Sequence, residues 1–381
     1  MKRVNNLFEK IISEDNIRQA INEVNKSHRW ASVGKPNKKV LWVETTKEER
    51  IKELRQIILN GFIPKPTISK RRWDSNAKKW RDINEPSLYP DQYVHHALIQ
   101  VLEPVMMRGM DKYCCGSIKG RGAIYGVNAI KKWMKYDNSG TRWCAELDIY
   151  HFYEQLTPEV VLNRFRKLVK DRKTLDLIER VLINDITIGA YFSQWFANTV
   201  LQELDHKLRE SGIGIKHYLR YIDNITIFSN RKRSIIKAIQ IINKWLASHG
   251  MRLNSKRQYF RTKKRLPSAL GYRYGKGFTL IRKGVLLNIK RQIASYERKK
   301  RKGTLIPVKF AQSLLSRIGR LTHCNCYNIR NKYIRKGLIK ELKNIVRNNA
   351  RRNRLEWSTC LEIYRNMKLS EQNHDLMTVE I

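Results

Sequence analysis

The spacing of hydrophobic and polar residues alternates along the chain between a helical and a strand period, which predicts a mixed α and β fold. Apolar residues at helical spacing over 47–59, among them Ile51, Leu54 and Ile58, predict a helix that ends before Gly61. A second helical stripe covers 90–107. Between these helices, the runs 68–73 and 78–83 flank turn-forming residues at 74–76, so we predict a basic β-hairpin.

Two carboxylates fall at the ends of predicted strands in the middle of the chain. Over 142–149, apolar residues alternate with polar ones, which predicts a strand with one apolar face and Asp148 near its end. Around 217–229, two β-rich runs surround Asp223 and Asn224. Both Asp and Asn tolerate positive φ, so we predict that these two residues form a hairpin turn with the Asp223 carboxylate at its tip.

Helices are predicted after both of these segments. Thr157 is the expected N-cap and Pro158 the expected first residue of the helix after the strand at 142–149. After the hairpin, apolar residues at helical spacing over 235–246 predict a long helix, with Asn230 as its N-cap and Gly250 closing its end.

Composition and charge narrow the class of protein. A chain of 381 residues with 41% hydrophobic content can bury a core and is long enough for two or three packed units. The formal net charge of +43 implies a polyanionic partner, for which nucleic acid is the leading candidate and an anionic membrane surface the alternative. No stretch approaches the roughly 20 apolar residues that span a bilayer, so we expect a cytoplasmic protein without a membrane partner.

The six cysteines do not form the repeated CxxC pairs of a zinc site, and the nine histidines include no HExxH motif. We therefore expect reduced thiols and no structural metal.

The order of strand, helices, hairpin and helix is that of a polymerase palm, and it gives the two carboxylates a joint meaning. Transfer of a nucleotide to a primer 3′-hydroxyl uses two divalent cations about 3.5 to 4 Å apart. Mg²⁺ prefers oxygen ligands and keeps several waters, so Asp148, the Ile149 carbonyl and Asp223 would suffice. Taken singly, each Asp is more simply a turn or strand-end residue. Their joint placement favours the metal site.

At these positions the sequence resembles a known family. LDIYHFY at 147–153 is similar to motif A of reverse transcriptases, and RYIDN at 220–224 is similar to their YxDD box. Between them, IGAYFSQ at 188–194 is followed by WFAN at 195–198 and LD at 204–205. Most reverse transcriptases carry QGxxxSP here, whereas IGxxxSQ resembles the enzymes of bacterial and phage diversity-generating retroelements. Further segments at 78–86, 253–256, 268–272 and 316–323 resemble the fingers, motif D, primer grip and thumb of this family.

The resemblance implies a nucleotide-binding set made of Arg81, Tyr153, Ile188, Gly189, Gln194 and Lys256. Arg81 would stack on the incoming dNTP and touch its phosphates, or is simply a solvated Arg on a basic hairpin. Tyr153 matches the aromatic gate against a 2′-hydroxyl, although Phe152 beside it is either gate or core. Ile188 stands where most relatives have Gln, which removes a hydrogen-bonding check on the base pair. Lys256 either protonates the pyrophosphate or is one more basic face residue.

Gly189 fits a backbone that approaches the nucleotide closely. The resemblance also implies nucleic-acid contacts from Leu270, Gly271 and Tyr272 in the primer grip, and from Arg121 to the template backbone.

One position departs from the family pattern, since the second Asp of the YxDD box is Asn224. Asn224 keeps an oxygen ligand, so the implied metal set is Asp148, Ile149, Asp223 and Asn224, but it removes one negative charge. Three explanations compete: a natural variant with adequate activity, a substitution introduced to trap a complex, or a degenerate enzyme kept for binding.

The resemblance implies an α+β right-hand polymerase fold, with fingers and palm of antiparallel sheet plus helices at 47–287 and a helical thumb at 288–345. Residues 1–46 would be a basic N-terminal extension and 346–381 a C-terminal tail. The implied activity is synthesis of cDNA from a template-repeat RNA by an RNA-directed DNA polymerase, with two Mg²⁺ ions or Mn²⁺ in their place. Errors at template adenines would diversify a target gene (mutagenic retrohoming).

The implied partners are template RNA, a primer or cDNA, dNTPs and a small basic accessory protein. Alternatives are another bacterial reverse transcriptase, of retron, phage-defence or group II intron-like type, and a catalytically impaired RNA-binding scaffold. A tail of this length is too short for a nuclease or maturase domain, which argues against a group II intron protein.

Overall fold

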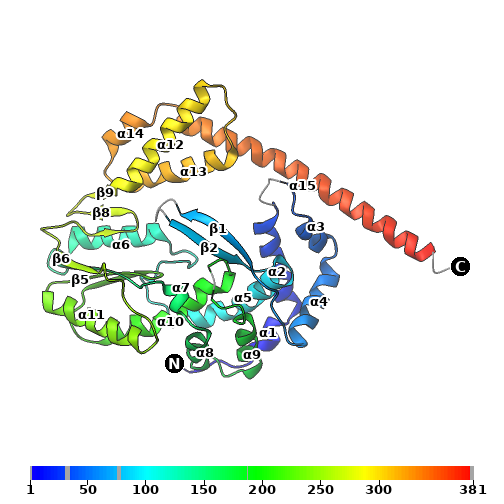
Figure 1. Cartoon of the computed structure of the whole chain (residues 1–381), viewed down its shortest axis with the longest axis horizontal. Helices are drawn as coiled ribbons and strands as arrows, with labels where there is room; N and C mark the ends of the chain where they lie inside the picture. The colour runs from blue at the N-terminus through cyan, green and yellow to red at the C-terminus, as the bar shows by residue number, and fades with distance from the viewer. Residues whose placement is uncertain (1, 31–34, 75–78, 187, 378–381) are drawn as a thin grey trace.

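The computed structural model describes residues 2–30, 35–74, 79–186 and 188–377 (Figure 1). Its N-terminal part is a layer of helices: α1 (Phe8–Ile11), α2 (Glu14–His28), α3 (Lys38–Thr45), α4 (Lys47–Leu59) and, after the hairpin, the π-turn η1 (Leu88–Gln92) and α5 (Tyr93–Met107). The helix predicted over 47–59 is confirmed by α4. Helix α2 begins after Ser13, whose hydroxyl accepts the backbone N–H of Asn16.

The segment 1–46 was expected to be a basic extension, but its described residues, 2–30 and 35–46, are part of the fold. One side of α2 places Ile17, Ile21 and Val24 in the largest hydrophobic cluster, where they lie with residues of α4 and α5. Because this apolar stripe packs on α5, the N-terminal helices are part of the main body and not an appended arm.

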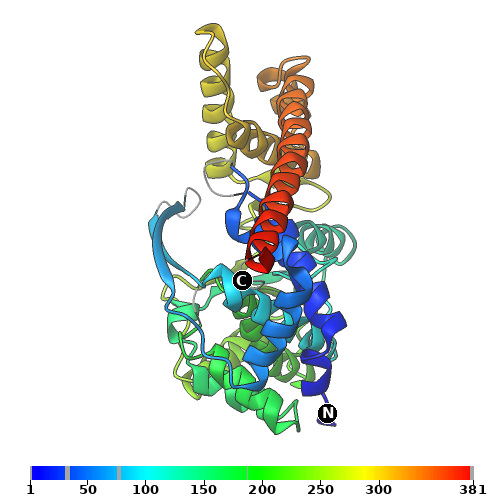
Figure 2. The ribbon, with the colours of Figure 1, turned by 90° about the vertical axis from the view of Figure 1, so that its right-hand side faces the viewer.

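The predicted hairpin is confirmed. Strands β1 (Ile68–Asp74) and β2 (Lys79–Glu85) pair antiparallel, and the expected turn lies mostly outside the described residues. Trp73 and Trp80 face each other across the ladder, with ring centroids 5.4 Å apart, and both are about half exposed. Figure 2 shows the hairpin standing out from the helices.

The central layer is a four-stranded antiparallel sheet in the order β4 (His217–Tyr221), β5 (Asn224–Ser229), β3 (Trp143–Asp148), β6 (Gln258–Arg261). The expectation that β3 has one apolar face is wrong, because the sheet is covered on both sides. Ala145 and Leu147 belong to the largest cluster, whereas Cys144 is buried in another with residues of α6 (Ala123–Tyr136). Burial on both faces explains why the polar-looking Cys144 position is fully enclosed.

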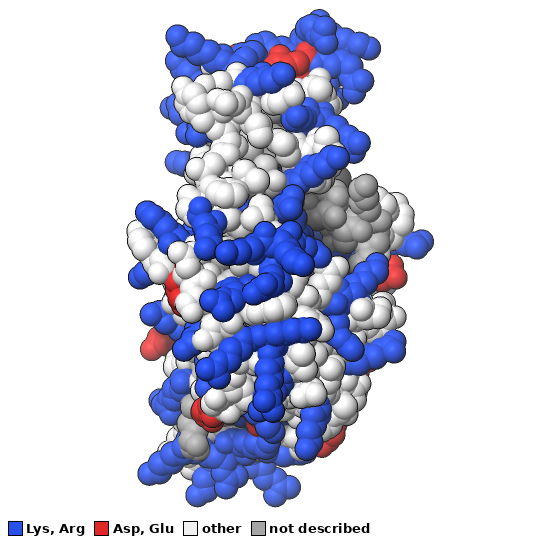
Figure 3. Space-filling model, turned by 90° about the vertical axis from the view of Figure 1, so that its left-hand side faces the viewer, with Lys and Arg blue, Asp and Glu red and all other residues white. Residues whose placement is uncertain are grey.

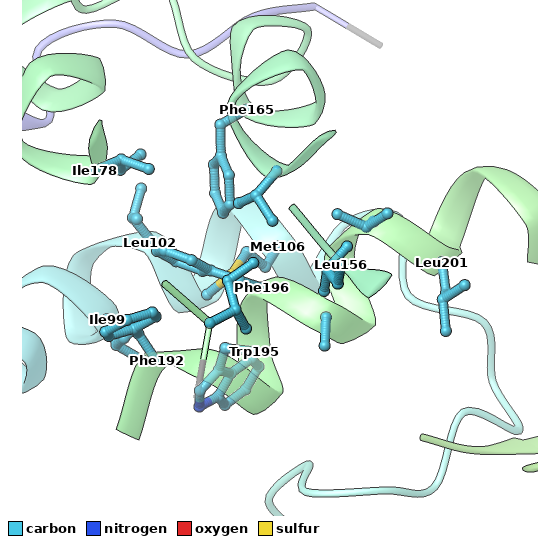
Figure 4. Packing of buried hydrophobic residues seen from close by; sticks show 14 of the residues in the cluster. Ile99, Leu102, Met106, Leu156, Phe165, Ile178, Phe192, Trp195, Phe196 and Leu201 are labelled. Carbon is cyan, nitrogen blue, oxygen red and sulfur yellow. The ribbon is translucent and has the colours of Figure 1, made fainter. Parts of the chain in front are cut away.

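Helices α7 (Phe152–Gln155), α8 (Pro158–Arg166), α9 (Arg172–Val181), α10 (Tyr191–Glu210) and α11 (Lys232–Ala247) complete this body. Figure 4 shows side chains from α5, α8, α9 and α10 meeting in its core, among them Leu102, Phe165 and Phe196. Pro158 opens α8 as predicted, but the Thr157 side chain makes no capping bond. The N-cap of α11 is Arg231, not Asn230, and the Arg231 N–H donates to the Ser229 hydroxyl at 3.3 Å.

A small sheet, β7 (Ser268–Ala269), β8 (Tyr272–Tyr274) and β9 (Thr279–Ile281), leads to a helical unit with its own hydrophobic cluster. This unit contains α12 (Lys283–Arg301), α13 (Val308–Gly319), the 3₁₀ turn η2 (Arg320–His323), α14 (Tyr327–Tyr333) and the start of α15 (Leu338–Met377). The boundaries expected at 287/288 and 345/346 therefore fall inside α12 and α15, because each helix continues across them.

Helix α15 carries the segment expected to be a C-terminal tail. Figure 1 shows it running from the thumb past α3, and its Trp357 is buried against Val40 and Leu41. Trp357 also meets the Trp30 ring edge-on at 6.2 Å. None of the described helices has the length and apolar character needed to cross a bilayer. The arrangement of hairpin, sheet with helices and helical thumb is the α+β right-hand polymerase fold that the sequence predicts.

Candidate active site

The turn between β4 and β5 lies one residue earlier than predicted. Tyr221 pairs with Asn224, so the two-residue loop is Ile222-Asp223, and Asn224 is the first residue of β5. The prediction is wrong because Asn224 also pairs with Asp148 of β3, which keeps it in the sheet and out of the turn. Ile222 takes φ +57°, an unfavourable conformation for a β-branched residue.

This turn brings the two predicted carboxylates together. Asn224 pairs with Asp148 across the ladder, and the Ile149 N–H donates to the Asp223 carbonyl at 3.2 Å. The Asn224 amide donates to Asp223 Oδ1 at 2.8 Å. Asp148, Ile149, Asp223 and Asn224 therefore meet at one edge of the sheet.

The electrostatics of this edge suit a cation. Burial, and then the nearby charge of Asp148, raise the pKa of Asp223, while the charge of Arg81 acts in the opposite direction. Two like charges in a half-buried site are stabilised by a divalent ion placed between them. No cluster of three or more Cys, His, Asp or Glu that could hold a metal occurs among the described residues, so the donor set is two carboxylates with neutral oxygens. Such a set fits a hard cation that keeps part of its water shell.

Asn254 is a site residue that the sequence reasoning missed. Its N–H donates to the Asp148 carbonyl at 2.8 Å, and its side-chain amide donates to Asp148 Oδ2 at 3.1 Å. Its Oδ1 accepts the N–H of Lys256 at 3.1 Å. Asn254 therefore links Asp148 to Lys256. The available signal was an Asn two residues before Lys256 in the segment resembling motif D.

The hairpin is seated on the motif at 188–194. Gly189 has φ +130°, and an ideal Cβ there would lie 2.8 Å from the Asn84 carbonyl oxygen and 2.9 Å from Ile83 Cγ2. The backbone that Gly189 approaches in this structure is thus that of β2, where a nucleotide was expected. Arg81 lies on the same strand, and its charge acts on Asp223. The hairpin therefore holds Arg81 near the carboxylates.

The alternatives for the two aromatic residues of motif A are separated by burial. Phe152 lies in the main core and is 3% exposed. Tyr153 is half-buried, and its hydroxyl has no hydrogen-bond partner among the described residues. Burial first, and then the charge of Asp223, raise the pKa of Tyr153. Tyr153 is thus the aromatic residue that faces the carboxylates. Ile188 is half-exposed just before α10, and Gln194 is exposed in the first turn of that helix.

A cleft of about 900 Å³ opens beside the carboxylates, between the sheet and the thumb. Its lining includes Asp148, Asn224, Lys256, Leu270 and Gly271, and, from α12 and η2, Val285, Asn288, Arg291 and Arg320. Leu270 and Gly271 form the β7–β8 turn with φ values of +54° and +89°. The structure therefore brings part of the predicted primer grip to the cleft that also contains Asp148 and Asn224.

Two predicted nucleic-acid residues do not line this cleft. Tyr272 is 2% exposed, and its hydroxyl donates to the Arg320 carbonyl at 2.8 Å, so it joins the small sheet to the thumb. Arg121 is half-buried and donates to the Asp111 carbonyl at 2.7 Å. Both side chains therefore make hydrogen bonds within the protein, each to a backbone carbonyl of a neighbouring segment.

Basic residues extend well beyond the cleft. Figure 3 shows Lys and Arg spread over one face of the molecule, with few acidic residues among them. This is the side on which Figure 1 shows α6, β6 and α11. Exposed cations on these elements include Lys132, Lys135, Lys237 and Arg261. Such a surface favours a large polyanion.

Comparisons with known proteins place this site in a sequence family. A family model described as "Reverse transcriptase (RNA-dependent DNA polymerase)" matches residues 63–274, which contain β1 to β8 and both carboxylates. "Nuclear intron maturase 1, mitochondrial" of Arabidopsis thaliana is 30% identical over 129 residues, 32% of this chain and 18% of the maturase. "Retron Ec86 reverse transcriptase" of Escherichia coli is 25% identical over 121 residues, 31% of this chain and 38% of the retron enzyme.

These matches thus span less than two fifths of the length of either curated relative. Among solved structures, telomerase from Candida albicans in complex with a fragment of telomeric RNA is similar with a TM-score of 0.46 and 11% identity. That alignment covers 85% of this chain and 70% of the telomerase chain.

Proposed function

The chain belongs to the reverse transcriptase (RNA-dependent DNA polymerase) family, and on this basis we propose that it is an RNA-directed DNA polymerase that extends a primer with dNTPs. The observation that carries the proposal is the meeting of Asp148 and Asp223 at the edge of the sheet, beside a cleft that reaches the thumb. Two Mg²⁺ ions, or Mn²⁺ in their place, would be held by Asp148, Asp223, the Ile149 carbonyl and Asn224.

Four residues around these ions would orient the ligands and bind the nucleotide: Asn254, Lys256, Arg81 and Tyr153. Bound divalent ions would activate the primer 3′-hydroxyl and neutralise the leaving pyrophosphate. Asn254 fixes the Asp148 carboxylate through the 3.1 Å bond, and it orients the segment that carries Lys256, the proton donor to pyrophosphate. Arg81 binds the triphosphate from the hairpin, and Tyr153 closes the nucleotide site on the side of Asp223.

We further propose that the template is a repeat RNA of a diversity-generating retroelement and that the cDNA carries errors opposite adenines. Support comes from IGAYFSQ at 188–194, where Ile188 precedes the residue seated on the hairpin. An apolar side chain cannot hydrogen-bond the nascent base pair, so shape alone would select the nucleotide. The activity would take place in the cytoplasm, with a small basic accessory protein as partner.

A second candidate is a retron or maturase-like reverse transcriptase without adenine-directed errors. The local similarity to a retron enzyme and an intron maturase favours it. The two candidates share the polymerase site and differ in fidelity, so the error spectrum of the product separates them.

The test is to sequence cDNA made by the purified protein on a template with all four bases. We compare the native protein with Ile188→Gln and, as a matched control, Ile183→Gln, which changes an apolar side chain that is 59% exposed elsewhere. The proposal expects an excess of errors at template adenines that falls in Ile188→Gln alone while total synthesis persists. Equal error rates at all four bases in the native protein would establish the second candidate. An active Ile188→Gln variant with an undiminished adenine excess would remove Ile188 from the explanation.

A further inference from the structure

A buried ion pair lies directly beneath the turn that carries Asp223. Arg220 is 0% exposed, and Asp205 of α10 is 1% exposed. The guanidinium binds the carboxylate in a bidentate manner, with Nη2 at 2.6 Å from Oδ2 and Nε at 2.8 Å from Oδ1. Burying two charges costs solvation that their attraction only partly offsets, so such a pair calls for a role beyond stability.

The same guanidinium reaches the catalytic turn. Its Nη1 donates to the Ile222 carbonyl at 3.1 Å and to Asn198 Oδ1 at 2.8 Å. Ile222 is the residue immediately before Asp223. Arg220 therefore connects helix α10, through Asp205 and Asn198, to the peptide group that leads into the metal ligand.

A loop closes the turn from the other side. The Asn198 amide donates to the Gly116 carbonyl at 2.8 Å, and the Cys115 N–H donates to the Arg220 carbonyl at 2.9 Å. An ideal Cβ at Gly116 would clash with the Ile222 side chain, so the loop leaves no room beside that side chain. Ile222 is thus enclosed between the buried guanidinium and the loop.

This enclosure explains how a β-branched residue stays at φ +57°. A strained backbone conformation persists only where several neighbours fix it, and here the Arg220 donor and the Gly116 contact do so together. If the Ile222 carbonyl lost its donor, the turn would relax, and the Asp223 side chain would shift relative to Asp148.

We propose that Arg220, held by Asp205 and Asn198, is a positioning residue that sets the place of Asp223 in the metal site and so the affinity of that site for divalent cations. The proposal rests on the proposed polymerase function. It assigns a role to Asn198 and Asp205, the residues of WFAN and LD for which the sequence offered none.

The experiment compares Arg220→Lys with a matched control, Arg164→Lys. Arg164 of α8 also anchors its guanidinium on α10, through the Thr199 carbonyl at 3.0 Å, Gln202 Oε1 at 2.8 Å and Glu203 Oε1 at 3.1 Å, and these acceptors lie outside the β4–β5 turn. Lysine keeps the positive charge beside Asp205 but lacks the second guanidinium nitrogen that donates to the Ile222 carbonyl. Two quantities are measured: the Mg²⁺ concentration that gives half-maximal primer extension, and the dissociation constant for Mn²⁺ by calorimetry on the protein without nucleic acid.

We expect Arg220→Lys to raise both values by about tenfold or more, the usual effect of losing a group that orients a metal ligand. Extension should recover at high Mg²⁺, RNA affinity should stay unchanged, and Arg164→Lys should stay within about twofold of the native protein on both measures. Tyr218→Phe, which removes a hydroxyl donor to Asp205 and leaves both charges, provides a milder variant with a smaller shift in the same direction.

A purely structural role for the ion pair predicts a different result. Arg220→Lys would then lower the melting temperature and lose activity equally at every Mg²⁺ concentration. Folded Arg220→Lys or Tyr218→Phe protein with native Mn²⁺ affinity would also overturn the proposal. If the native protein extends no primer, the polymerase function fails, but the Mn²⁺ titration still decides whether Arg220 positions the ligand.

Discussion

Replacing Gly189 with alanine tests whether the hairpin is seated on the motif that precedes α10. The added Cβ would lie 2.8 Å from the Asn84 carbonyl oxygen of β2. Because this oxygen belongs to the backbone, no side-chain rotation can relieve the contact. The φ of +130° adds backbone strain on the order of 1 to 3 kcal/mol. The protein can lower this cost by letting β2 move away.

Movement of β2 would carry Arg81 with it, because Arg81 lies three residues before Asn84 on the same strand. Loss of one charge-assisted contact to a phosphate is worth about 1 to 2 kcal/mol, which corresponds to a rise of roughly 5- to 30-fold in the KM for dNTP. The rate at saturating dNTP should fall less, since Asp148 and Asp223 do not move with the hairpin.

The matched control is Gly250→Ala. Gly250 has φ +72°, and no described atom lies within 4 Å of its ideal Cβ, so this variant adds backbone strain without the contact. Single-nucleotide extension on an RNA template gives KM and kcat, and thermal denaturation gives stability. A folded Gly189→Ala protein whose KM stays within about twofold of native, or a Gly250→Ala protein with the same rise, would refute the reasoning.

Three further outcomes are expected. Asp148→Ala and Asp223→Ala should each abolish divalent-dependent extension and leave RNA affinity nearly unchanged, and residual extension above roughly 5% in both would contradict the metal assignment. Asn224→Asp replaces the amide that donates to Asp223, and it should raise extension most at low Mg²⁺, by less than about tenfold or ~1.4 kcal/mol if the native site is otherwise adequate. A revertant with no gain at any Mg²⁺ concentration would rule out a charge deficit. Burial raises the pKa of the fully buried Asp91 carboxyl from its ordinary value of 3.8 to about 6. The free energy of unfolding should therefore fall as the pH rises between these two values, because the folded state holds a proton that the unfolded state has lost. Relative to the native protein, the free energy of unfolding of Asp91→Asn should therefore be up to about 3 kcal/mol higher at pH 8 than at pH 4. If the substitution changed the melting temperature equally at both pH values, Asp91 would not titrate in this way.

Elements with local signals could be predicted from the sequence. The helix at 47–59 and the hairpin at 68–85 were predictable because, within each segment, the spacing of hydrophobic residues and the position of the turn-forming residues indicate the same element. The sequence did not show that the N-terminal helices belong to the main body, although Ile17 and Ile21 lie on one apolar stripe of α2. A stripe reveals that a helix is amphipathic, but not which partner covers it.

Within the site, errors arose where distant residues decide. Asp and Asn both favour turns locally, yet the pairing of Asn224 with Asp148 and the hydrogen bond from Arg220 to the Ile222 carbonyl hold the loop at Ile222-Asp223. Tyr272 belongs to a motif that resembles the primer grip, but only the packed thumb shows that its hydroxyl is used internally. The sequence did not indicate Asn254, because two of its hydrogen bonds go to Asp148, 106 residues earlier in the chain, and a single sequence does not show such a contact.

Helix α15 makes the thumb and the N-terminal helices thermodynamically dependent on each other. At 1.5 Å per residue its 40 residues extend about 60 Å, with Leu342 packed in the thumb cluster and Trp357 docked on α3. If a bound duplex restrained the thumb, it would restrain this helix as well and would favour the packing of Trp357 on α3. By reciprocity, that packing would then favour duplex binding by the same free energy. Trp357, 15 residues beyond Leu342 on the same helix, would then help to determine the affinity for the duplex although it lies outside the cleft.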